Sequence, residues 1–296
     1  MKGIILAGGL GTRLYPLTLN ISKQLLPIYD KPMIYYPLST LMLAGIKEIL
    51  IISNEESING FDQLLGNGKS LGLEISYAIQ KEPNGIAEAF IIGKSFIGLD
   101  DVTLILGDNM FFGNNLSVYL SNALENCKNG YSTIFGSYVT DPNRFGIVEF
   151  DRFGNIISLE EKPNKPRSSY AVVGLYCYTN EVINIVNGIV PSERGELEIT
   201  SVNNEFLLRE KLKLILFERG IAWLDTGTFD SLLDAINFVG SYQKRTGLHI
   251  SNIEEIALRK GFISPKKLEK TLIEMPKNEY YNYLRRLLKS LKFDAR

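Results

Sequence analysis

The chain has 296 residues, of which 45% are hydrophobic, and its 32 basic and 33 acidic side chains give a formal net charge of −1. This composition is typical of a globular protein with a sizeable core, and the balanced charge gives no general attraction to nucleic acid or anionic membranes. Two cysteines and one histidine are too few for a disulfide framework or a His/Cys zinc site, and a catalytic triad would depend on His249 alone. Any metal should therefore have oxygen ligands, which favours Mg²⁺.

The first half of the chain predicts a parallel sheet covered by helices. Apolar runs of strand length alternate there with stretches of helical spacing, as in α/β folds. Pro37 falls in the first turn of one predicted helix, where proline is tolerated. The N-terminal apolar run is too short to span a membrane, so we expect a cytoplasmic protein with no membrane partner. The predicted strands are residues 2–6, 48–53, 74–80 and 102–106, and the predicted helices are 33–44, 55–65 and 86–96.

The second half changes to closely spaced strands and then to helices. A hairpin turn is predicted at residues 151–155, and the chain is almost wholly helical from Phe229, with breaks at Gly247, Gly261 and Pro276. We therefore predict a catalytic α/β domain at residues 1–237, with a small antiparallel strand insert, and a helical C-terminal extension at 238–296. The predicted strands are 131–139, 147–151, 156–161, 170–178, 212–218 and 222–225, and a helix is predicted at 197–209.

The first predicted strand leads into a glycine-rich loop with the sequence LAGGLGTRL at residues 6–14. Its glycines let backbone N–H groups turn toward phosphate oxygens, and Arg13 adds a planar, permanently charged fork. Leu14 stands where a dinucleotide fingerprint has a third Gly or Ala, and the loop lacks the Gly-Lys-Ser/Thr ending of a Walker A motif. From this loop alone, a plain strand-to-helix turn remains an alternative to a phosphate site.

Two acidic residues follow predicted strands, Asp108 within LILGDN (104–109) and Asp225 within AWLDTGT (222–228). Ligands of parallel sheets gather at the carboxyl ends of the strands, and Mg²⁺ usually takes one or two protein carboxylates. The two acids are therefore candidates for sharing one Mg²⁺. A turn or helix-capping role is the alternative for Asp108.

Other polar segments are ambiguous by themselves. Lys23 and Gln24 in SKQLLP (22–27) suit a phosphate and a base or sugar edge, but such a pair is more often solvated surface. Glu161 and Lys162 in EEKP (160–163) suit a sugar hydroxyl and a sugar phosphate, or a charged strand end at the surface. The segment GELEIT (195–200) is typical of a helix start with acids in the first turn.

Together these segments closely resemble the glucose-1-phosphate thymidylyltransferase family. They occur in the family's order and approximate spacing, and the similarity runs from Met1 to about Phe262. The resemblance implies a Rossmann-like nucleotidyltransferase fold with a central, mostly parallel sheet. It also implies Mg²⁺-dependent reaction of dTTP with α-D-glucose 1-phosphate to dTDP-glucose and pyrophosphate, the first step toward dTDP-rhamnose and related deoxysugars. The matching segments are 8–14, 22–27, 106–109, 159–163, 171–176, 195–200 and 223–228.

The resemblance also assigns roles to single residues. Arg13, Lys23 and Lys162 would act in catalysis by alignment and charge neutralisation, and Asp108 and Asp225 would hold Mg²⁺. The residues implied for substrate binding are Gly8, Gly11 and Thr12 at the triphosphate, Gln24, Gln80 and Gly85 at the thymine, Gly146, Glu161 and Val172 at the glucose phosphate with Arg194 and Glu196 nearby, and Asn109.

Three positions near this site depart from the family pattern. Leu10 replaces a small residue, commonly serine, and is expected to point away from the phosphates because the loop would bind through its backbone. Phe145 stands where tyrosine is frequent, and Val173 stands where threonine is frequent. Phe145 has no hydroxyl, so any contact that a tyrosine hydroxyl makes to sugar or phosphate is absent here.

A second nucleotide-sugar site is also implied by the resemblance. It would lie between subunits of a homotetramer and bind a dTDP-sugar end product, commonly dTDP-rhamnose, as a feedback inhibitor. Asn114 replaces a histidine and Phe112 a tyrosine, so the effector or its affinity is expected to differ. A basic helix end packed on the core is the alternative for Arg259. The implied residues are Phe112, Gly113, Ser251, Glu255, Ile256 and Arg259.

Three other functions match parts of this pattern. A uridylyl- or cytidylyltransferase, or an enzyme for another hexose phosphate, would keep the chemistry and change the substrate. A catalytically inactive nucleotide-sugar sensor would share the fold, although it has no need of the metal acids Asp108 and Asp225. A nicotinamide-dependent dehydrogenase is disfavoured by Leu14 in the glycine-rich loop.

Overall fold

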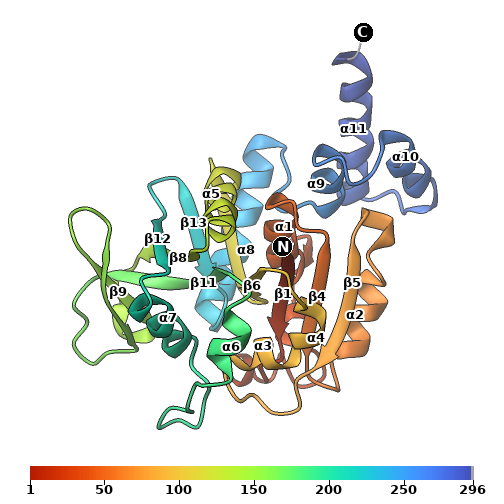
Figure 1. Cartoon of the computed structure of the whole chain (residues 1–296). Helices are drawn as coiled ribbons and strands as arrows, with labels where there is room; N and C mark the ends of the chain where they lie inside the picture. The colour runs from red at the N-terminus through yellow and green to blue at the C-terminus, as the bar shows by residue number, and fades with distance from the viewer. Residues whose placement is uncertain (295–296) are drawn as a thin grey trace.

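The computed structural model of the protein describes residues 1–294, and its centre is a nine-stranded sheet (Figure 1). Four parallel strands form one side of this sheet in the order β6-β1-β4-β5, with β5 at the edge, and β1, β4 and β6 are apolar runs long enough to cross the core. Ile4 and Ile5 of β1 are both fully buried but belong to different core clusters, so the sheet is covered on both faces. These strands are β1 (Lys2–Ala7), β4 (Glu48–Ser53), β5 (Glu74–Ile79) and β6 (Val102–Leu106).

Antiparallel strands extend the sheet beyond β6. The long strand β11 (Tyr170–Tyr178) pairs antiparallel with β6, and the β9–β10 hairpin and β8 pair onto β11. This confirms the predicted antiparallel insert, which lies at the left in Figure 1. The remaining strands are β8 (Ser132–Tyr138), β9 (Gly146–Phe150), β10 (Ile156–Glu161) and β12 (Leu212–Leu216), of which β12 runs parallel to β8.

A separate two-stranded ribbon crosses the carboxyl end of the main sheet. It pairs β7 (Asn109–Gly113) antiparallel with β13 (Ile221–Asp225), and its register places Asp225 opposite Asn109. The strand at 222–225 is thus present as predicted, but it lies outside the main sheet. A second short ribbon joins β2 (Pro27–Ile28) to β3 (Lys31–Pro32).

Helices cover both faces of the sheet. On one face α1 and α5 share a core cluster with residues of the C-terminal helices, and on the other face α3, α6 and α7 bury residues such as Phe90 and Phe206. The helices are α1 (Tyr35–Leu43), α2 (Ile58–Leu65), α3 (Glu88–Ile92), α4 (Lys94–Ile97), α5 (Leu116–Lys128), α6 (Val182–Val186), α7 (Ile199–Leu208), α8 (Phe229–Thr246), α9 (Ile253–Arg259), α10 (Pro265–Glu274) and α11 (Glu279–Asp294).

Most predicted elements are confirmed, with three differences. The helix predicted at 86–96 is two short helices, α3 and α4, that meet at Gly93, where the chain packs closely against Ile4. Sequence reasoning missed the short strands β2 and β3 as well as β7, α5 and α6, although Leu116, Leu120, Ala123 and Cys127 of α5 are buried at helical spacing. The predicted domain boundary at 237/238 falls within α8, so the division into domain and extension stays a prediction.

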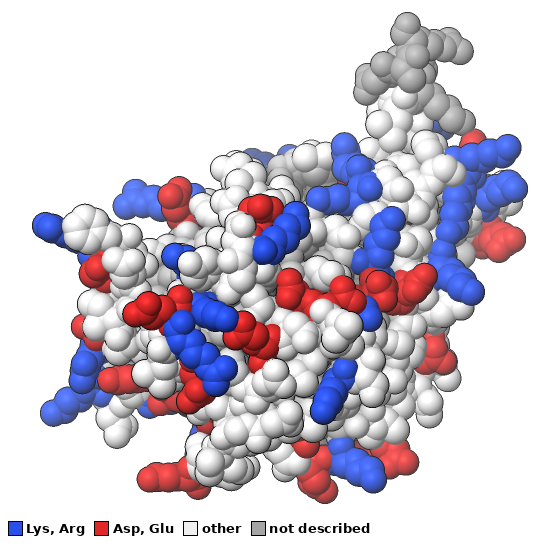
Figure 2. All heavy atoms as spheres, viewed as in Figure 1, with Lys and Arg blue, Asp and Glu red and all other residues white. Residues whose placement is uncertain are grey.

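The distribution of charged side chains on the surface agrees with the nearly equal numbers of acidic and basic residues. Figure 2 shows acidic and basic side chains interspersed over one face, with basic ones gathered near the C-terminal helices. Both cysteines are free and buried, and burial raises the pKa of each thiol. In the part of the chain that the structure describes, no helix is long and apolar enough to cross a membrane.

Candidate active site

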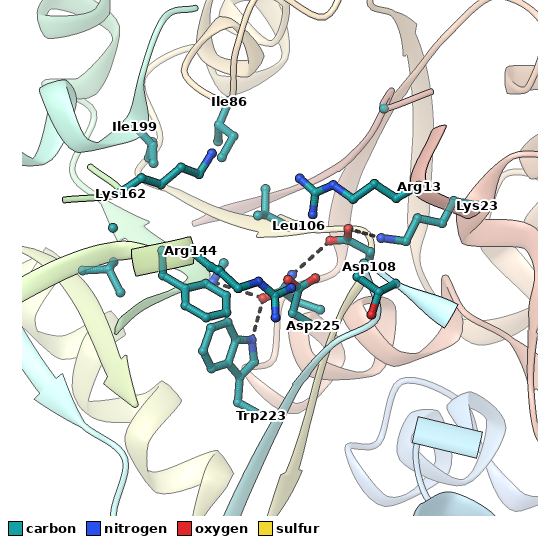
Figure 3. Close-up of a pocket in the computed structure, with 18 of the residues that line it drawn as sticks. Arg13, Lys23, Ile86, Leu106, Asp108, Arg144, Lys162, Ile199, Trp223 and Asp225 are labelled. Atoms are coloured by element: carbon teal, nitrogen blue, oxygen red, sulfur yellow. Dashed lines mark hydrogen bonds and ion pairs between the residues drawn. The ribbon is translucent and has the colours of Figure 1, made fainter. Parts of the chain in front are cut away.

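A cavity of about 770 Å³ opens at the carboxyl ends of β1 and β6 (Figure 3). Its walls come from the glycine-rich loop, the β6–β7 junction, the insert strands, the start of α7 and the end of β13. The single histidine, His249, does not line it and instead stacks on Tyr283 with 4.0 Å between ring centroids. The cavity is therefore built for charge and hydrogen bonding without imidazole.

The glycine-rich loop supplies one wall. Gly11 has a φ of 62°, which favours glycine, and a Cβ there would lie 2.9 Å from the Thr18 side chain. Leu14 is fully buried and anchors the short helical turn that carries Arg13. Arg13 is exposed, has no hydrogen bond or ion pair among the side chains that the structure describes, and points into the cavity in Figure 3. Its guanidinium is therefore available to a ligand. Leu10 is 62% exposed and does not line the cavity, as expected.

Lys23 and Asp108 form a buried ion pair at the floor of the cavity. Lys23 Nζ lies 2.6 Å from Asp108 Oδ2, and the lysine side chain is only 8% exposed. Burial raises the pKa of Asp108, but the Lys23 ammonium and hydrogen bonds from Lys23 and Asn109 outweigh it and leave the pKa lowered. Asp108 is thus an ionised carboxylate with Lys23 as its internal partner.

Asp225 lies beside Asp108 at the end of the β7–β13 ribbon. The next residue, Thr226, donates from Oγ1 to the Asp108 carbonyl oxygen at 2.9 Å, which ties the two acidic positions together. Burial and the Asp108 charge raise the pKa of Asp225 to about 6. Two neighbouring carboxylates of which one is hard to ionise form an electrostatic arrangement that a divalent cation relieves.

Asn109 joins three strands at this point. Its Nδ2 donates to Asp108 Oδ1 at 3.0 Å, and its Oδ1 accepts from Trp223 Nε1 at 2.7 Å and from the Gly174 backbone N–H at 3.2 Å. Asn109 is 3% exposed, and a Cβ on Gly174 would lie 2.7 Å from its Oδ1. The amide therefore fixes the orientation of Asp108, β11 and β13 relative to one another.

The far end of the cavity carries Glu161 and Lys162. Glu161 Oε2 accepts from Thr200 Oγ1 at 2.6 Å, and a Cβ on Gly146 would lie 3.1 Å from the same oxygen. Lys162 adopts a φ of 44°, a left-handed conformation that non-glycine residues rarely adopt, and its Nζ is 3.7 Å from Glu161 Oε1. Such local strain often marks a functional position. Figure 3 shows Lys162 across the cavity from Lys23.

A loop before α7 closes this end. Arg194 Nη2 lies 2.7 Å from Glu198 Oε1, 3.4 Å from Glu196 Oε2 and 3.8 Å from Glu161 Oε1. Arg194 and Glu196 do not line the cavity, but their ion pairs connect the loop to Glu161, which does.

The predicted base-binding residues do not lie together, because Gln24 and Gln80 lie near the glycine-rich loop whereas Gly85 lies against the loop before α7. Gln24 lines the cavity, whereas Gln80 follows β5 and reaches over Gly8 just beside it. Gly85 has a φ of 112° and packs on the Leu197 backbone, where a Cβ would lie 2.5 Å from the carbonyl oxygen. Leu197 N–H donates to the Asn84 carbonyl at 2.6 Å. The loop at 80–88 is thus joined to the loop that carries Arg194.

Most of the residues predicted for the site are brought together. Gly8, Gln80, Gly85, Arg194 and Glu196 lie outside the lining. Sequence reasoning assigned no role to Arg144 and Trp223, which also line the cavity. Arg144 lies two residues before Gly146 and Trp223 two residues before Asp225, so proximity to predicted residues was the available signal. The predicted residues in the lining are Gly11, Thr12, Arg13, Lys23, Gln24, Asp108, Asn109, Gly146, Glu161, Lys162, Val172 and Asp225, and other lining residues include Arg144, Phe145, Tyr176, Thr200 and Trp223.

The residues predicted for a regulatory site lie on β7 and near α9, and both elements contact α1. Phe112 packs edge-on against Tyr242 at 4.7 Å between centroids, and Gly113 is required by the close approach of Gly220. Arg259 is exposed and its Nε donates to Glu255 Oε1 at 2.7 Å.

Comparison with known proteins agrees with this fold and identifies the family. The family model for nucleotidyl transferases matches residues 2–241, so the cavity belongs to a nucleotidyltransferase. Glucose-1-phosphate thymidylyltransferases from Neisseria meningitidis and Mycobacterium tuberculosis are each 52% identical to the chain; the alignments cover 98% and 97% of it and 100% and 99% of those proteins. The chain belongs to the glucose-1-phosphate thymidylyltransferase family.

Solved structures show the same relationship. A Bacillus anthracis protein with the provisional name glucose-1-phosphate thymidylyltransferase, in complex with a sucrose, is 39% identical with a TM-score of 0.74, over 80% of this chain and 94% of that one. A UDP-glucose pyrophosphorylase complexed with UDP-glucose is 26% identical with a TM-score of 0.72, over 82% and 99%.

Proposed function

We propose that this protein transfers a thymidylyl group from dTTP to α-D-glucose 1-phosphate and releases pyrophosphate. One observation carries the proposal: the paired acids Asp108 and Asp225 line the same cavity as the free guanidinium of Arg13 on one side and Glu161 and Lys162 on the other. A triphosphate fits the first side and a sugar phosphate the second. The names of the relatives that cover nearly the whole chain supply the substrates.

The acid pair fits Mg²⁺. Within residues 1–294 no three His, Cys, Asp or Glu side chains cluster as a complete metal site, so Asp108 and Asp225 would bind the ion together with substrate oxygens. When bound, Mg²⁺ would neutralise charge on the phosphates and orient them. Two carboxylate ligands and a raised pKa at Asp225 support this assignment.

The side chains would act by alignment and charge. Lys162 would hold the sugar phosphate while one of its oxygens attacks the α-phosphorus of dTTP in line with the departing pyrophosphate. The new P–O bond forms as the bond between the α-phosphorus and the bridging oxygen breaks. Arg13 and Lys23 would stabilise the charge on the phosphates. The attacking phosphate oxygen is already ionised, so no general base is needed, and His249 is not among the residues that line the cavity.

The base preference tests this function. Gln24 and Gln80 carry amides that suit the carbonyl and imide edge of thymine. We expect purine and cytosine nucleotides to be poor substrates, by roughly ten- to a hundredfold in kcat/KM for each buried amide left unpaired, and UTP to be partly accepted. Pyrophosphate release measured with dTTP, UTP, dCTP and ATP, each with several sugar phosphates, checks this.

The same assay separates the alternatives. Higher turnover with UTP than with dTTP would favour a uridylyltransferase, the alternative to which the UDP-glucose pyrophosphorylase of similar structure corresponds. No pyrophosphate from any pair, with nucleotide binding intact, would indicate an inactive sensor. Equal rates with ATP and dTTP would contradict the proposed base contacts.

The wider assignments are proposals of the same kind. The chain would act in the cytoplasm as a homotetramer, with residues 1–237 as the catalytic domain and 238–296 as an extension for contacts between subunits. A dTDP-sugar would bind near Arg259, whose exposed guanidinium suits a diphosphate. Asn114 and Phe112 would adjust which effector binds.

Replacing Arg259 by Ala is expected to relieve inhibition by dTDP-rhamnose, with a rise of about tenfold or more in the inhibitory concentration and little change in uninhibited turnover. Arg259 makes its only ion pair among the described residues with Glu255 on its own helix, so the fold should persist. Inhibition curves at saturating substrate measure the effect. Purely competitive inhibition that is equal in parent and variant would contradict a second site.

A further inference from the structure

Two glutamines present opposite ends of their carboxamides at the nucleotide end of the site. Gln24 Oε1 accepts from Ser22 Oγ at 2.7 Å, whereas Gln80 Nε2 donates to Glu88 Oε2 at 2.7 Å. Among the side chains that the structure describes, Gln24 Nε2 and Gln80 Oε1 have no protein hydrogen-bond partner, and neither atom is sealed from solvent. A donor on one amide and an acceptor on the other are therefore left for a ligand.

Glu88 fixes the direction of the Gln80 amide more firmly than Ser22 fixes that of Gln24. An ionised carboxylate only accepts hydrogen bonds, so the amide nitrogen of Gln80 must face it. Rotating the amide by half a turn would set two acceptor oxygens against each other. A serine hydroxyl both donates and accepts, so Ser22 tolerates either direction of Gln24.

The surroundings hold both members of the pair in place. Asn84 Nδ2 donates to the second carboxylate oxygen of Glu88 at 2.9 Å, so Glu88 is held from two sides. The Gln80 side chain is 5% exposed, and its Oε1 lies directly over Gly8, where a Cβ would overlap it. Gly8 begins the glycine-rich loop, so this oxygen faces the space where a nucleotide on that loop would place its base.

We propose that Glu88 is a positioning residue that keeps Gln80 as a hydrogen-bond acceptor and thereby selects pyrimidines with an imide N–H. Thymine and uracil carry a proton on N3, which matches Gln80 Oε1, and a carbonyl at C4, which matches a donor such as Gln24 Nε2. Cytosine has an acceptor at N3 and an amino group at C4, the reverse pattern. The inference rests on the proposed function in placing a pyrimidine nucleotide at this end of the cavity.

The variant Glu88→Gln tests the proposal, because it keeps the size of the side chain but lets Gln80 bond in either direction. We expect the ratio of kcat/KM for dTTP over dCTP to fall about tenfold, which is the value of one hydrogen bond to a charged group. The ratio for dTTP over dUTP should stay unchanged, since both bases carry the imide N–H. If Glu88 had a merely structural role, the substitution would lower kcat/KM for dTTP, dCTP and dUTP by the same factor, and both ratios would stay unchanged.

Matched variants complete the experiment. Glu82→Gln removes an exposed carboxylate from the same loop and should leave the dTTP over dCTP ratio unchanged. Asn84 is exposed, and Asn84→Ala removes one of the two hydrogen bonds that hold Glu88. This variant should lower the dTTP over dCTP ratio by about threefold, and it replaces Glu88→Gln in the test if that variant does not fold. An unchanged ratio in a folded Glu88→Gln variant, or in Asn84→Ala where that variant is used, overturns the proposal.

A binding measurement separates this inference from the reaction. Calorimetric titration with dTDP and dCDP needs no turnover, and the preference for dTDP should fall in Glu88→Gln as the kinetic ratio does. If the wild-type protein released no pyrophosphate from dTTP, the proposed function would fail while this titration still decided the role of Glu88. Equal preference for dTDP in wild type and variant overturns the inference and leaves the function standing.

Discussion

Asp225→Asn is expected to lower turnover about a thousandfold or more while leaving the metal-free protein as stable as the wild type, or more stable. Burial and Asp108 raise the pKa of Asp225 from 3.8 to about 6, so at neutral pH the ionised carboxylate costs folding free energy. This cost is absent at a pH below 3.8, the pKa of Asp225 in the unfolded chain. It grows as the pH rises and reaches its full size above about pH 6, the pKa in the folded protein. The neutral amide removes it and, with it, a ligand of the cation.

Thermal unfolding without and with Mg²⁺ measures both effects, the change in stability of the metal-free protein and the loss of a ligand of the cation. At about pH 8 the metal-free variant should match or exceed the wild type, and the advantage should vanish near pH 4. Mg²⁺ with nucleotide should stabilise the wild type more than the variant.

Asp108→Asn should be equally inactive but less stable, because it leaves the buried Lys23 ammonium without its partner at 2.6 Å. Asp234→Asn, on the exposed side of α8, is the control. Near-normal activity of either variant in saturating Mg²⁺ would contradict the two-carboxylate site.

Arg13→Ala is expected to lower kcat/KM for dTTP by about a hundredfold or more without changing the melting temperature. The guanidinium has no hydrogen bond or ion pair within the described residues, so the folded protein loses no internal contact. Arg13→Lys should restore only part of the activity, because an ammonium cannot form the paired hydrogen bonds of the planar fork.

Steady-state kinetics with varied dTTP and fixed sugar phosphate measure this effect. Arg219→Ala removes another exposed arginine and should leave kcat/KM unchanged. A fall in the melting temperature of Arg13→Ala by several degrees would show that Arg13 supports the loop rather than the phosphates. Activity close to that of the wild type would remove Arg13 from the proposed mechanism.

The sequence predicted the parallel part of the sheet well, because β1, β4 and β6 are continuous apolar runs bounded by polar residues. The ends of β4, β6 and β10 were placed to the residue. The ribbon of β7 and β13 was not foreseen: β7 begins one residue after Asp108, and nothing local says that β13 leaves the main sheet to pair with it. Long-range pairing is decided by tertiary packing, which single-sequence periodicity does not contain.

For the site, chemistry-bearing residues next to glycines or at strand ends were predictable. Asp108 and Asp225 were expected to meet, and they do. The contacts that support these residues were not predictable. The hydrogen bond between Trp223 and Asn109 joins residues that lie 114 positions apart, and the hydrogen bond from Gln80 to Glu88 requires the chain after β5 to place Gln80 over Gly8. Such contacts depend on side-chain direction rather than residue type.

The backbone pairing between Leu197 and the loop at 80–88 bears on how the two substrates influence each other. Leu197 N–H bonds to the Asn84 carbonyl, and its own carbonyl accepts from Ala87 N–H at 3.1 Å, so the base side and the sugar side share one wall. If the proposed nucleotide orders this wall, we expect the loop with Arg194 to be held in place for the sugar phosphate as well. By thermodynamic linkage, the factor by which dTTP tightens glucose 1-phosphate must equal the factor by which glucose 1-phosphate tightens dTTP.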